Sequence, residues 1–406
     1  MEKNENIVTN ANKSGHEKRN VPTLRFRGFT DNWALTPIKK LLKLQNGINA
    51  DSNKYGKGVK YISVSDILNN QYITYDCIKG LIDIDEKTFN KFIVEYGDIL
   101  FQRSSETFED IGRANVYLDK EHPATFGGFV IRGKKISDYD PLFFRYLLCT
   151  YNARKQTIRM GAGAQHYNIG QEGLERISLY FPSIIEQEKI SLFLNLLDDK
   201  IEVQNKIISK YETLIKGIRH RIFSCVANGR METLGSFLEE YSEKNTANNL
   251  QSVAVGKYGI RKREDIYSKE LSSDYSKNKV IRKDTLIIGM GSTQIDIGIL
   301  TTDNCYCVSP AYTTYRIKGI DSFYLQEYLT DLNPLLSVRY MVTSARQGKA
   351  VNKDDLMQHL LAIHSDLEQE KIHQFFQHIY GRLLIEKRML SALQKQKAFL
   401  LQSMFI

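Results

Sequence analysis

Two long stretches of the chain carry apolar residues at alternating spacings of four and three positions. The first stripe consists of Ile190, Leu194, Leu197, Ile201, Gln204, Ile208, Tyr211, Ile215, Ile218 and Ile222. The second consists of Ile372, Phe376, Ile379, Leu383, Glu386, Leu390, Leu393, Lys397, Leu400 and Met404. Such spacing is typical of a coiled-coil seam. An amphipathic helix lying on its own domain is the alternative, but the stripe is longer than one domain core needs.

One polar residue interrupts each seam near its middle, Gln204 in the first stripe and Glu386 in the second. Buried polar groups at such positions fix the register and the choice of partner helix at some cost in stability. A helix of about 37 residues rises about 55 Å at 1.5 Å per residue. The sequence thus predicts a rigid rod of two helices.

The chain also contains an internal repeat. The sequence Glu-Gln-Glu-Lys-Ile occurs at residues 186–190 and again at 368–372. Further matches are Gln165 with Gln347, Ile169 with Val351, Leu174 with Leu356, and the segments 97–100 and 140–148 with 283–286 and 321–329. A period of about half the chain is too long for a solenoid repeat. Two tandem copies of one plan, each a globular part followed by a helical part, are the simpler explanation.

The globular parts carry short runs of β-branched and aromatic residues bounded by Gly, Asp or Asn, which favour strands. The predicted strands cover residues 59–64, 98–102, 124–132, 284–288, 296–301 and 311–317, and the predicted helices cover 141–159 and 323–340. A polar turn at Asn228-Gly229-Arg230 separates the copies. We expect a mixed α/β (α+β) fold with a disordered tail at 1–20, globular domains at 21–184 and 227–366, and long helices at 185–226 and 367–406.

Composition supports two folded domains, because 406 residues with 42% hydrophobic content can build two cores. A formal charge of +9 suits a partner with a phosphate backbone, although many basic proteins bind no nucleic acid. Five cysteines are too few and too irregular for a disulfide framework and fit a reducing cytosol. With neither a signal-peptide pattern nor an apolar run long enough for a bilayer, the sequence predicts a cytoplasmic protein.

The usual motifs for catalysis are missing from the sequence. It contains no GxxxxGK[ST] phosphate loop, no Asp/Asn-Pro-Pro-aromatic adenine-methylation motif, no HExxH and no GxSxG. Asn333-Pro334-Leu335-Leu336 lacks the second proline and the aromatic residue, and we interpret it as a helix interruption. Gly289-Met290-Gly291-Ser292 lies between two predicted strands and favours a hairpin turn over a cofactor cradle.

Two groups of residues invite a metal hypothesis. Cys305 and Cys307 lack the second pair or His cluster that would complete four zinc ligands. We interpret the acidic residues Asp83, Asp85 and Glu86 as a solvated turn. The sequence therefore predicts no metal site and no cofactor in this chain.

Polar loops supply the first set of candidate DNA-binding residues. They are Gln102, Arg103, Ser104 and Arg113 in the first copy and Ser292, Thr293 and Gln294 at the corresponding place in the second. Arg can pair bidentately with guanine and Gln with adenine, whereas Ser and Thr can contact bases or phosphates.

A second candidate surface follows the helix of each globular part. Its residues are Arg159, Gln165, His166 and Asn168 in the first copy and Arg346, Gln347 and Lys349 in the second. Neighbouring glycines let the backbone approach phosphate closely. The alternative is that Gly161 and Gly163 only end a helix and turn the chain.

The order of these parts carries a family resemblance. A variable domain and an EQEKI-type helix, each occurring twice, resemble the specificity subunit of Type I restriction-modification systems over nearly the whole chain. The opening Pro22-Thr23-Leu24-Arg25-Phe26, followed by Gly28-Phe29 and Trp33, also resembles the start of such subunits. The resemblance implies two target-recognition domains, a spacer of two antiparallel helices and an asymmetric bipartite double-stranded DNA target.

The resemblance also implies partners for a chain that is itself non-catalytic. Two modification subunits would bring S-adenosylmethionine and methylate adenine at N6, and restriction subunits would add translocation and cleavage with ATP and Mg. The spacer would contain Leu197, Ile201, Gln204, Ile208, Leu383, Glu386 and Leu390, and its exposed faces would dock the modification subunits. One departure is Lys283, which replaces the first glycine of the Gly-Asp-Ile-Leu motif in the second copy.

Two other functions remain open on the residues alone. A coiled-coil adaptor that binds only protein would show no salt-dependent DNA binding. A self-sufficient DNA methyltransferase or nuclease would need the motifs that are missing. The target bases depend on loop geometry, which the sequence does not reveal.

Overall fold

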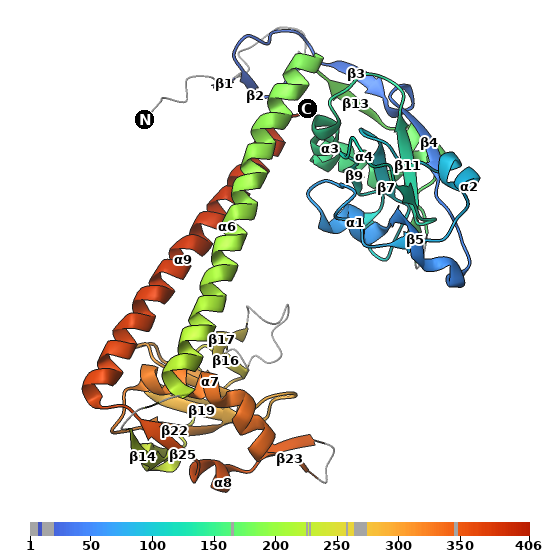
Figure 1. The fold of residues 1–406 in the computed structure, drawn as a ribbon. Coiled ribbons are helices and arrows are strands. Elements are labelled where there is room, and N and C mark those ends of the chain that lie inside the picture. Colours follow the sequence, from blue (N-terminus) through green and yellow to red (C-terminus); the bar gives the residue numbers. More distant parts are fainter. Residues whose placement is uncertain are drawn as a thin grey trace. The chain divides into compact units, whose positions relative to one another are not determined.

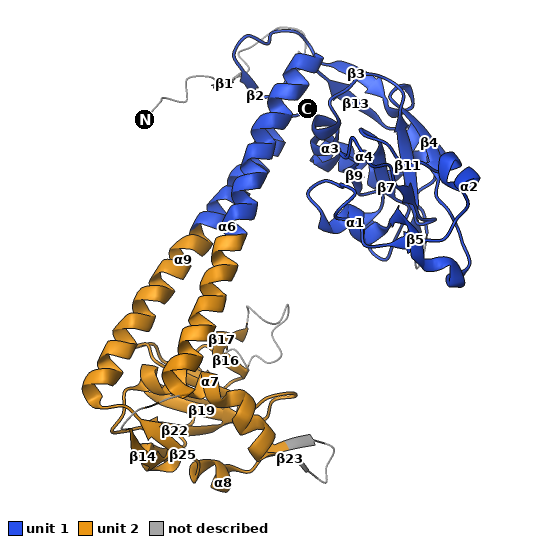
Figure 2. Ribbon diagram, viewed as in Figure 1, with its two compact units in different colours: residues 1–205, 389–406 blue, residues 206–388 orange. Residues whose placement is uncertain are grey.

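The computed structural model describes residues 7–9, 20–163, 166–224, 226, 229–256, 259–263, 274–344 and 348–406. It divides into two compact units, the first of residues 1–205 with 389–406 and the second of residues 206–388 (Figure 2). Each unit contains one globular part and a portion of both long helices.

A four-stranded antiparallel sheet in the order β4-β11-β7-β9 forms the centre of the first unit (Figure 1). Its strands are β4 (Leu42–Asn46), β7 (Ile99–Gln102), β9 (Ala114–Val116) and β11 (Val130–Lys135). Successive residues of a strand point to opposite faces of the sheet. Accordingly, Ile99 and Phe101 of β7 belong to one apolar core and Leu100 belongs to a second core. The predicted strand at 98–102 is thereby confirmed as a buried strand.

Smaller strands and helices complete the first unit. The paired strands are β1 (Ile7–Thr9) with β2 (Leu24–Phe26), β3 (Ala34–Pro37) with β13 (Ser178–Phe181), β5 (Tyr55–Ile62) with β6 (Leu81–Ile82) and β10 (Thr125–Phe126), and β8 (Ser104–Ser105) with β12 (Tyr167–Asn168). The helices are α1 (Val64–Asn69), α2 (Glu86–Lys91), α3 (Pro141–Cys149), α4 (Tyr151–Arg159) and α5 (Gln171–Glu175). Short 3-10 helices cover Ile38–Lys40, Ser52–Lys54 and Phe108–Asp110.

The single helix predicted over residues 141–159 is wrong, because the chain breaks into α3 and α4 at Thr150. Asp140 starts α3 by accepting a hydrogen bond from the Phe143 amide. Thr150 has extended backbone geometry, and its side chain accepts a hydrogen bond from the amide of Ala153 in the first turn of α4. Such caps satisfy amides that the first turn of a helix leaves unpaired.

The second unit repeats the sheet of the first with the strand order β15-β22-β19-β20. These strands are β15 (Leu238–Tyr241), β19 (Thr285–Gly289), β20 (Asp296–Leu300) and β22 (Thr313–Ile317), and all their pairings are antiparallel. The other pairs are β14 (Arg230–Thr233) with β25 (Leu360–Ile363), β16 (Val253–Gly256) with β17 (Gly259–Lys262), β18 (Lys279–Ile281) with β21 (Tyr306–Val308), and β23 (Met341–Ser344) with β24 (Gly348–Val351). The helices are α7 (Ser322–Tyr340) and α8 (Lys353–Met357), and a 3-10 helix covers Leu234–Phe237. The internal repeat is therefore a repeat of sheet topology.

Pro334 lies inside α7 and does not interrupt it, so the predicted helix interruption is wrong. The helix is fastened to the loop before β20 on both sides of the proline. Asn333 donates a hydrogen bond to the Ile295 carbonyl at 3.0 Å, and the Ile295 amide donates to the Ser337 hydroxyl at 2.9 Å. These buried bonds offset the backbone hydrogen bond that a proline removes.

The two long helices are α6 (Ile184–Ser224) and α9 (Asp366–Ser403). Every residue of the two predicted seams is buried or half-buried, which confirms the coiled-coil stripe. Within the second unit, Glu212 pairs with Lys387 at 2.7 Å and Arg219 donates to the Tyr380 hydroxyl at 2.6 Å. The residue on α6 is thus 219 − 212 = 7 positions later in the second contact, and its partner on α9 is 387 − 380 = 7 positions earlier. The helices pack antiparallel.

The repeated EQEKI motif has a structural role at the start of each long helix. Gln187 accepts a hydrogen bond from the Asp140 amide at 3.0 Å and donates to the Pro182 carbonyl at 2.9 Å. Gln369 likewise accepts a hydrogen bond from the amide of Asp321 at 3.2 Å. Since Asp140 and Asp321 cap α3 and α7, the glutamine fastens each long helix to the helix of its own globular part.

The Gly-Asp-Ile-Leu turn differs between the two units where Lys283 replaces Gly97. Gly97 has a φ of +89°, a conformation that residues with a side chain rarely adopt. In the second unit, the residue after Lys283, Asp284, has a φ of +61° instead. Aspartate tolerates the left-handed region better than most residues, so the turn moves along by one residue.

Candidate nucleic-acid interface

The two candidate surfaces of the first unit meet in one place. The loop after β7 forms β8, the segment after α4 forms β12, and the two short strands pair antiparallel with Ser104 opposite Asn168. The Ser104 hydroxyl also donates a hydrogen bond to the Asn168 side chain. His166 and Asn168 are exposed beside this pair, and Ser104 is half-buried. We call this the β8–β12 surface.

Arg103 connects the β8–β12 surface to a third loop. Its amide donates to the Phe129 carbonyl at 2.8 Å, its guanidinium donates to the Gly128 carbonyl at 3.3 Å, and its own carbonyl accepts from the Ile169 amide at 3.0 Å. These contacts hold the arginine backbone between two loops, and the side chain is half-buried. A backbone fixed in this way lowers the entropy that an arginine would lose on binding DNA.

Phe129 is a feature of this surface that the sequence interpretation missed. Its side chain is 68% exposed, which is unusual for a large aromatic residue in a folded domain. An exposed ring can stack on a base or insert between base steps. The available signal was Gly127-Gly128-Phe129, since glycines let a loop approach another backbone closely.

Glycines allow that close approach. A Cβ atom on Gly47 would lie 2.1 Å from the Gly127 carbonyl oxygen, nearer than real Cβ atoms come. The loops at 47–49 and 127–129 therefore run against each other with backbone in contact, and Ile48 forms an isolated parallel bridge with Gly127. This packing determines where Phe129 and Arg103 lie.

Gln102 is placed differently from the other candidates. Its side chain is 5% exposed, and its amide nitrogen donates to the Ser104 carbonyl at 2.9 Å. In this structure the side chain supports the loop, and its predicted contact with DNA stays a prediction.

Exposed basic side chains border the β8–β12 surface. Arg159 at the end of α4 is exposed, and Arg113 is exposed while it pairs with Asp110 at 2.7 Å. Arg154 donates to two backbone carbonyls of the 109–111 segment, and burial lowers the pKa of its guanidinium. Arg154 thus braces the loop, whereas Arg159 and Arg113 can reach phosphate.

In the second unit, the predicted hairpin is confirmed, because β19 and β20 pair with Gly289 opposite Asp296. Ser292 and Thr293 are exposed at its tip, and Gln294 is half-buried. Thr293 and Gln294 line an open groove with Met341 and other residues at the end of α7 and the start of β23. Here, too, the loop after the central strand lies beside the segment that follows the helix.

One carboxyl group in this region has a shifted pKa. Burial raises the pKa of Asp296 from 3.8 to about 6. Its place at the start of β20 puts this titrating group directly after the candidate loop.

Several candidate positions are not described by the structure. Gln165, Arg346 and Gln347 lie outside the described residues. The backbone of Lys349 belongs to β24, where it pairs with Thr343. Contact of these residues with DNA stays a prediction.

The metal hypotheses gain no support from the described residues, which contain no group of three or more potential His, Cys, Asp or Glu ligands. Asp85 caps α2 by accepting from the Thr88 amide, and this hydrogen bond lowers the pKa of its carboxyl group. Asp83 pairs with Lys57 at 3.0 Å, and the Cys307 thiol donates to the Leu250 carbonyl. Among the helices that the structure describes, none combines the length and apolar character needed to cross a bilayer.

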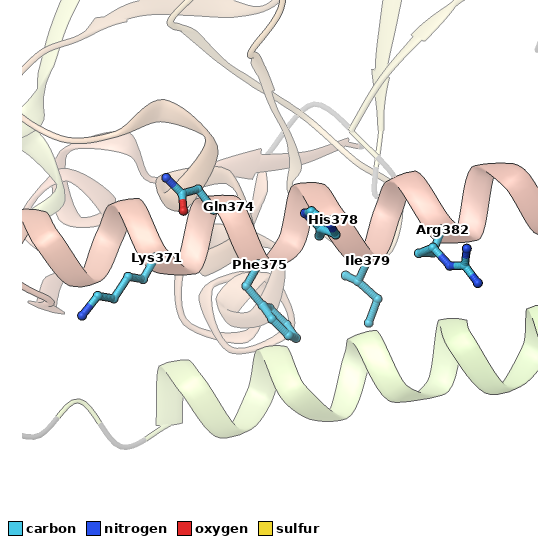
Figure 3. Close-up of a pocket in the computed structure, with 6 residues that line it drawn as sticks. All are labelled: Lys371, Gln374, Phe375, His378, Ile379 and Arg382. Carbon is cyan, nitrogen blue, oxygen red and sulfur yellow. The ribbon is translucent and has the colours of Figure 1, made fainter.

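The second unit also contains an open pocket on α9. It is lined by Lys371, Gln374, Phe375, His378, Ile379 and Arg382, with Phe375 and Ile379 pointing toward α6 (Figure 3). In the first unit, the residues equivalent to Phe375 and Lys371 by the EQEKI repeat are Phe193 and Lys189. There the ring of Phe26 packs on Phe193 at 5.7 Å, and Lys189 lies over the Phe26 ring at 4.9 Å. The N-terminal segment thus covers a face that stays open on α9.

Comparison with known proteins agrees with this architecture. Residues 30–213 match the model of a family described as the Type I restriction modification DNA specificity domain. The S subunit of a Type-I restriction-modification system from M. genitalium has a similar fold, with a TM-score of 0.56 and 16% identity over 95% of this chain and 99% of that chain. A second similar chain comes from a structure described as the structural basis of complex assembly and conformational transition of the type I R-M system. Its TM-score is 0.58, and its sequence identity is 14% over 91% of this chain and 96% of that chain.

Two units share one α/β topology, and each contains a portion of both long helices. The chain thus has a two-domain α/β architecture with a pair of long helices. At these low identities the structural likeness concerns the fold, and it extends over both units. Residues 30–213 match the Type I restriction modification DNA specificity domain, and the fold over nearly the whole chain is similar to that of a Type I S subunit, which confirms the resemblance predicted from the sequence.

Proposed function

We propose that this chain is the DNA sequence-specificity subunit of a Type I restriction-modification enzyme. In this function, each unit recognises one half of an asymmetric bipartite target. Modification subunits then methylate adenine at N6, and restriction subunits translocate and cleave the DNA. The chain itself contributes recognition and no catalysis.

The observation that carries the proposal is the meeting of two polar segments at the β8–β12 surface. Arg103, Ser104 and Asn168 come from segments more than sixty residues apart, yet β8 and β12 pair directly. Their side chains offer the donors and acceptors that base edges and phosphates require. Converging loops on a rigid sheet are a common way to build a binding surface.

The differences between the units favour an asymmetric target. The first unit presents the β8–β12 pair, whereas the second presents the β19–β20 loop beside the β23–β24 hairpin. Arginine favours guanine and glutamine favours adenine, so Arg103 and Gln294 would select different bases. Each correctly recognised base pair contributes about 1–3 kcal/mol of discrimination.

Exposed faces of the long helices would dock the modification subunits. The pocket around Phe375 and Ile379 supports this assignment, because the equivalent face of the first unit is already covered by the segment containing Phe26. S-adenosylmethionine, ATP and Mg would be bound by the partner subunits.

Selection from a random DNA library tests the proposal. The complex of this chain with its modification subunits should enrich one motif with two separated halves. Arg103→Ala combined with Asn168→Ala should relax only one half, while Lys57→Ala, which removes an exposed basic residue paired with Asp83, should leave both halves intact. Enrichment of no motif by a complex that is assembled and soluble would favour the protein-binding adaptor.

A further inference from the structure

A buried tyrosine joins the globular part of the first unit to its long helices. The Tyr146 hydroxyl on α3 donates a hydrogen bond to the Asp198 carboxylate on α6 at 2.8 Å. Both side chains are buried, at 0% and 6% exposure. Lys397 on α9 also pairs with Asp198, so residues from three helices meet in one polar cluster.

The second unit contains a matching cluster. The Tyr380 hydroxyl on α9 donates to the Glu327 carboxylate on α7 at 2.9 Å. Arg219 on α6 donates to Glu327 at 2.8 Å and to Tyr380 at 2.6 Å. Glu327 is 2% exposed, so this carboxylate is also fully enclosed.

The two clusters occupy equivalent positions with their groups exchanged. The repeat of 140–148 at 321–329 has an offset of 321 − 140 = 181, which makes Tyr146 equivalent to Glu327. The EQEKI repeat has an offset of 368 − 186 = 182, which makes Asp198 equivalent to Tyr380. The first unit therefore has its tyrosine on the globular part and its carboxylate on the long helix, and the second unit has the reverse.

The cation is exchanged as well. The carboxylate of the first cluster pairs closely with Lys397 of α9 and more distantly, at 3.7 Å, with Arg145 of α3, and that of the second pairs with Arg219 of α6. In each unit the nearest cation comes from the long helix that does not directly follow the globular part. Both clusters thus link one globular helix to both long helices through a single carboxylate.

Stability alone is a weak explanation for such clusters. Enclosing a carboxylate costs desolvation energy, and well-packed apolar residues are often at least as stabilising as a buried ion pair. Directional hydrogen bonds instead select one arrangement among similar packings, because any shift leaves a buried group unpaired. Burial together with the neighbouring carboxylate raises the pKa of Tyr146, and the same causes raise that of Tyr380, so each hydroxyl remains a donor.

We propose that the Tyr146–Asp198–Lys397 and Tyr380–Glu327–Arg219 clusters are positioning devices that set the orientation of each globular part on the helix pair. Through that orientation they determine which gap length between the two half-sites the complex accepts. This inference rests on the proposed function. Among the described residues, the six cluster side chains form their hydrogen bonds and ion pairs with groups other than the candidate base-contacting residues, so the clusters control spacing while base recognition stays with the loops.

The test measures gap discrimination by the full complex with its modification subunits. DNA duplexes carry the same two half-sites with the natural gap or with a gap one base pair longer or shorter. Tyr146→Phe removes only the hydroxyl, and Tyr380→Phe does so in the second unit. Tyr180→Phe is the matched control, since Tyr180 is half-buried and its hydroxyl has no hydrogen bond with any residue that the structure describes.

Each cluster variant should lose about tenfold of the discrimination between natural and altered gaps, the loss expected for one hydrogen bond to a charged group. Affinity for the natural gap should stay close to that of the wild type, and the control should keep full discrimination. A cluster variant that keeps wild-type discrimination, or that weakens binding to all three duplexes equally, would overturn the proposal.

An exchange variant provides the second arm. Tyr146→Glu combined with Asp198→Tyr installs in the first unit the arrangement of the second. This double variant should recover gap discrimination that Tyr146→Glu alone loses, and a folded double variant without recovery would count against the proposal. Wild-type complex that recognises no half-site on any duplex would refute the proposed function itself, a result distinct from either variant outcome.

Discussion

The backbone contact between the loops at 47–49 and 127–129 gives a prediction whose size follows from the structure. Gly47→Ala places a Cβ atom 2.1 Å from the Gly127 carbonyl oxygen and 2.6 Å from its carbonyl carbon. Both are backbone atoms, so no side chain can rotate away to make room. The two loops must separate by about 1 Å to restore normal van der Waals contact.

Overpacking of this kind costs about 1–3 kcal/mol. For a unit of roughly 200 residues, each kcal/mol lowers the melting temperature by about 2–4 °C, so a decrease of about 2–12 °C is expected. Separation of the loops also moves Phe129 and Arg103. Binding to the half-site that the first unit recognises should therefore weaken, while binding to the other half-site should not change.

Calorimetric melting and titration of DNA containing one intact half-site measure these two effects. Gly170→Ala is the control, because a Cβ atom there meets no atom of the described part of the chain within 4 Å and the residue has a φ of −101°. If Gly47→Ala melts and binds as Gly170→Ala does, the loops are not in contact as described, and the reasoning about the position of Phe129 fails.

Three further predictions concern charges. Arg25→Ala leaves the Glu186 carboxylate, which is 1% exposed, without its bidentate partner. Chemical denaturation should show a free energy of unfolding that is lower by about 3–5 kcal/mol. Arg25→Met combined with Glu186→Leu should recover most of this loss. Burial raises the pKa of the Asp296 carboxyl from 3.8 to about 6, so this group contributes most to the free energy of unfolding below pH 3.8. That contribution is lost as the pH rises through about 6. Asp296→Asn should remove this pH dependence in urea titrations, and an unchanged profile would contradict the raised pKa of Asp296. Arg159→Ala should weaken binding to all DNA sequences alike and reduce the slope of log affinity against log salt by about 1, whereas a change confined to one base of the target would indicate base contact instead.

The long helices were predictable from sequence because their periodicity repeats over many turns. Seam residues such as Leu197 and Leu383 are buried on one side of a helix, and this requirement leaves a direct pattern in the chain. The equivalence of the two sheets was predictable for a related reason, since the matched segments at 97–100 and 283–286 lead into the central strand of each unit.

Helix boundaries inside the globular parts were predicted less well. Thr150 interrupts a helical pattern with a side-chain cap, and no local composition marks it as a break. Pro334 has the opposite effect, because the sequence indicates an interruption while Asn333 and Ser337 hold α7 together through contacts with Ile295. At Pro334 tertiary hydrogen bonds overrule local propensity, whereas at Thr150 a local side-chain cap starts a new helix.

The candidate interface was predictable as separate segments but not as one surface. The sequence identified polar loops at 102–104 and 159–168, but the pairing of Ser104 with Asn168 spans 64 residues of chain. Such pairing depends on how α3 and α4 return the chain to the sheet. Phe129 was missed for the same reason, since its exposure follows from the contact between the loops at Gly47 and Gly127.

The central claim is that this chain directs a partner's adenine methylation to one bipartite sequence. It is tested most directly by mapping N6-methyladenine, with long-read sequencing, in cells that carry the modification subunit with and without this chain. The account predicts a single new bipartite motif that appears only with the chain. Absence of any new motif, in cells where both proteins are expressed and assembled, would contradict it.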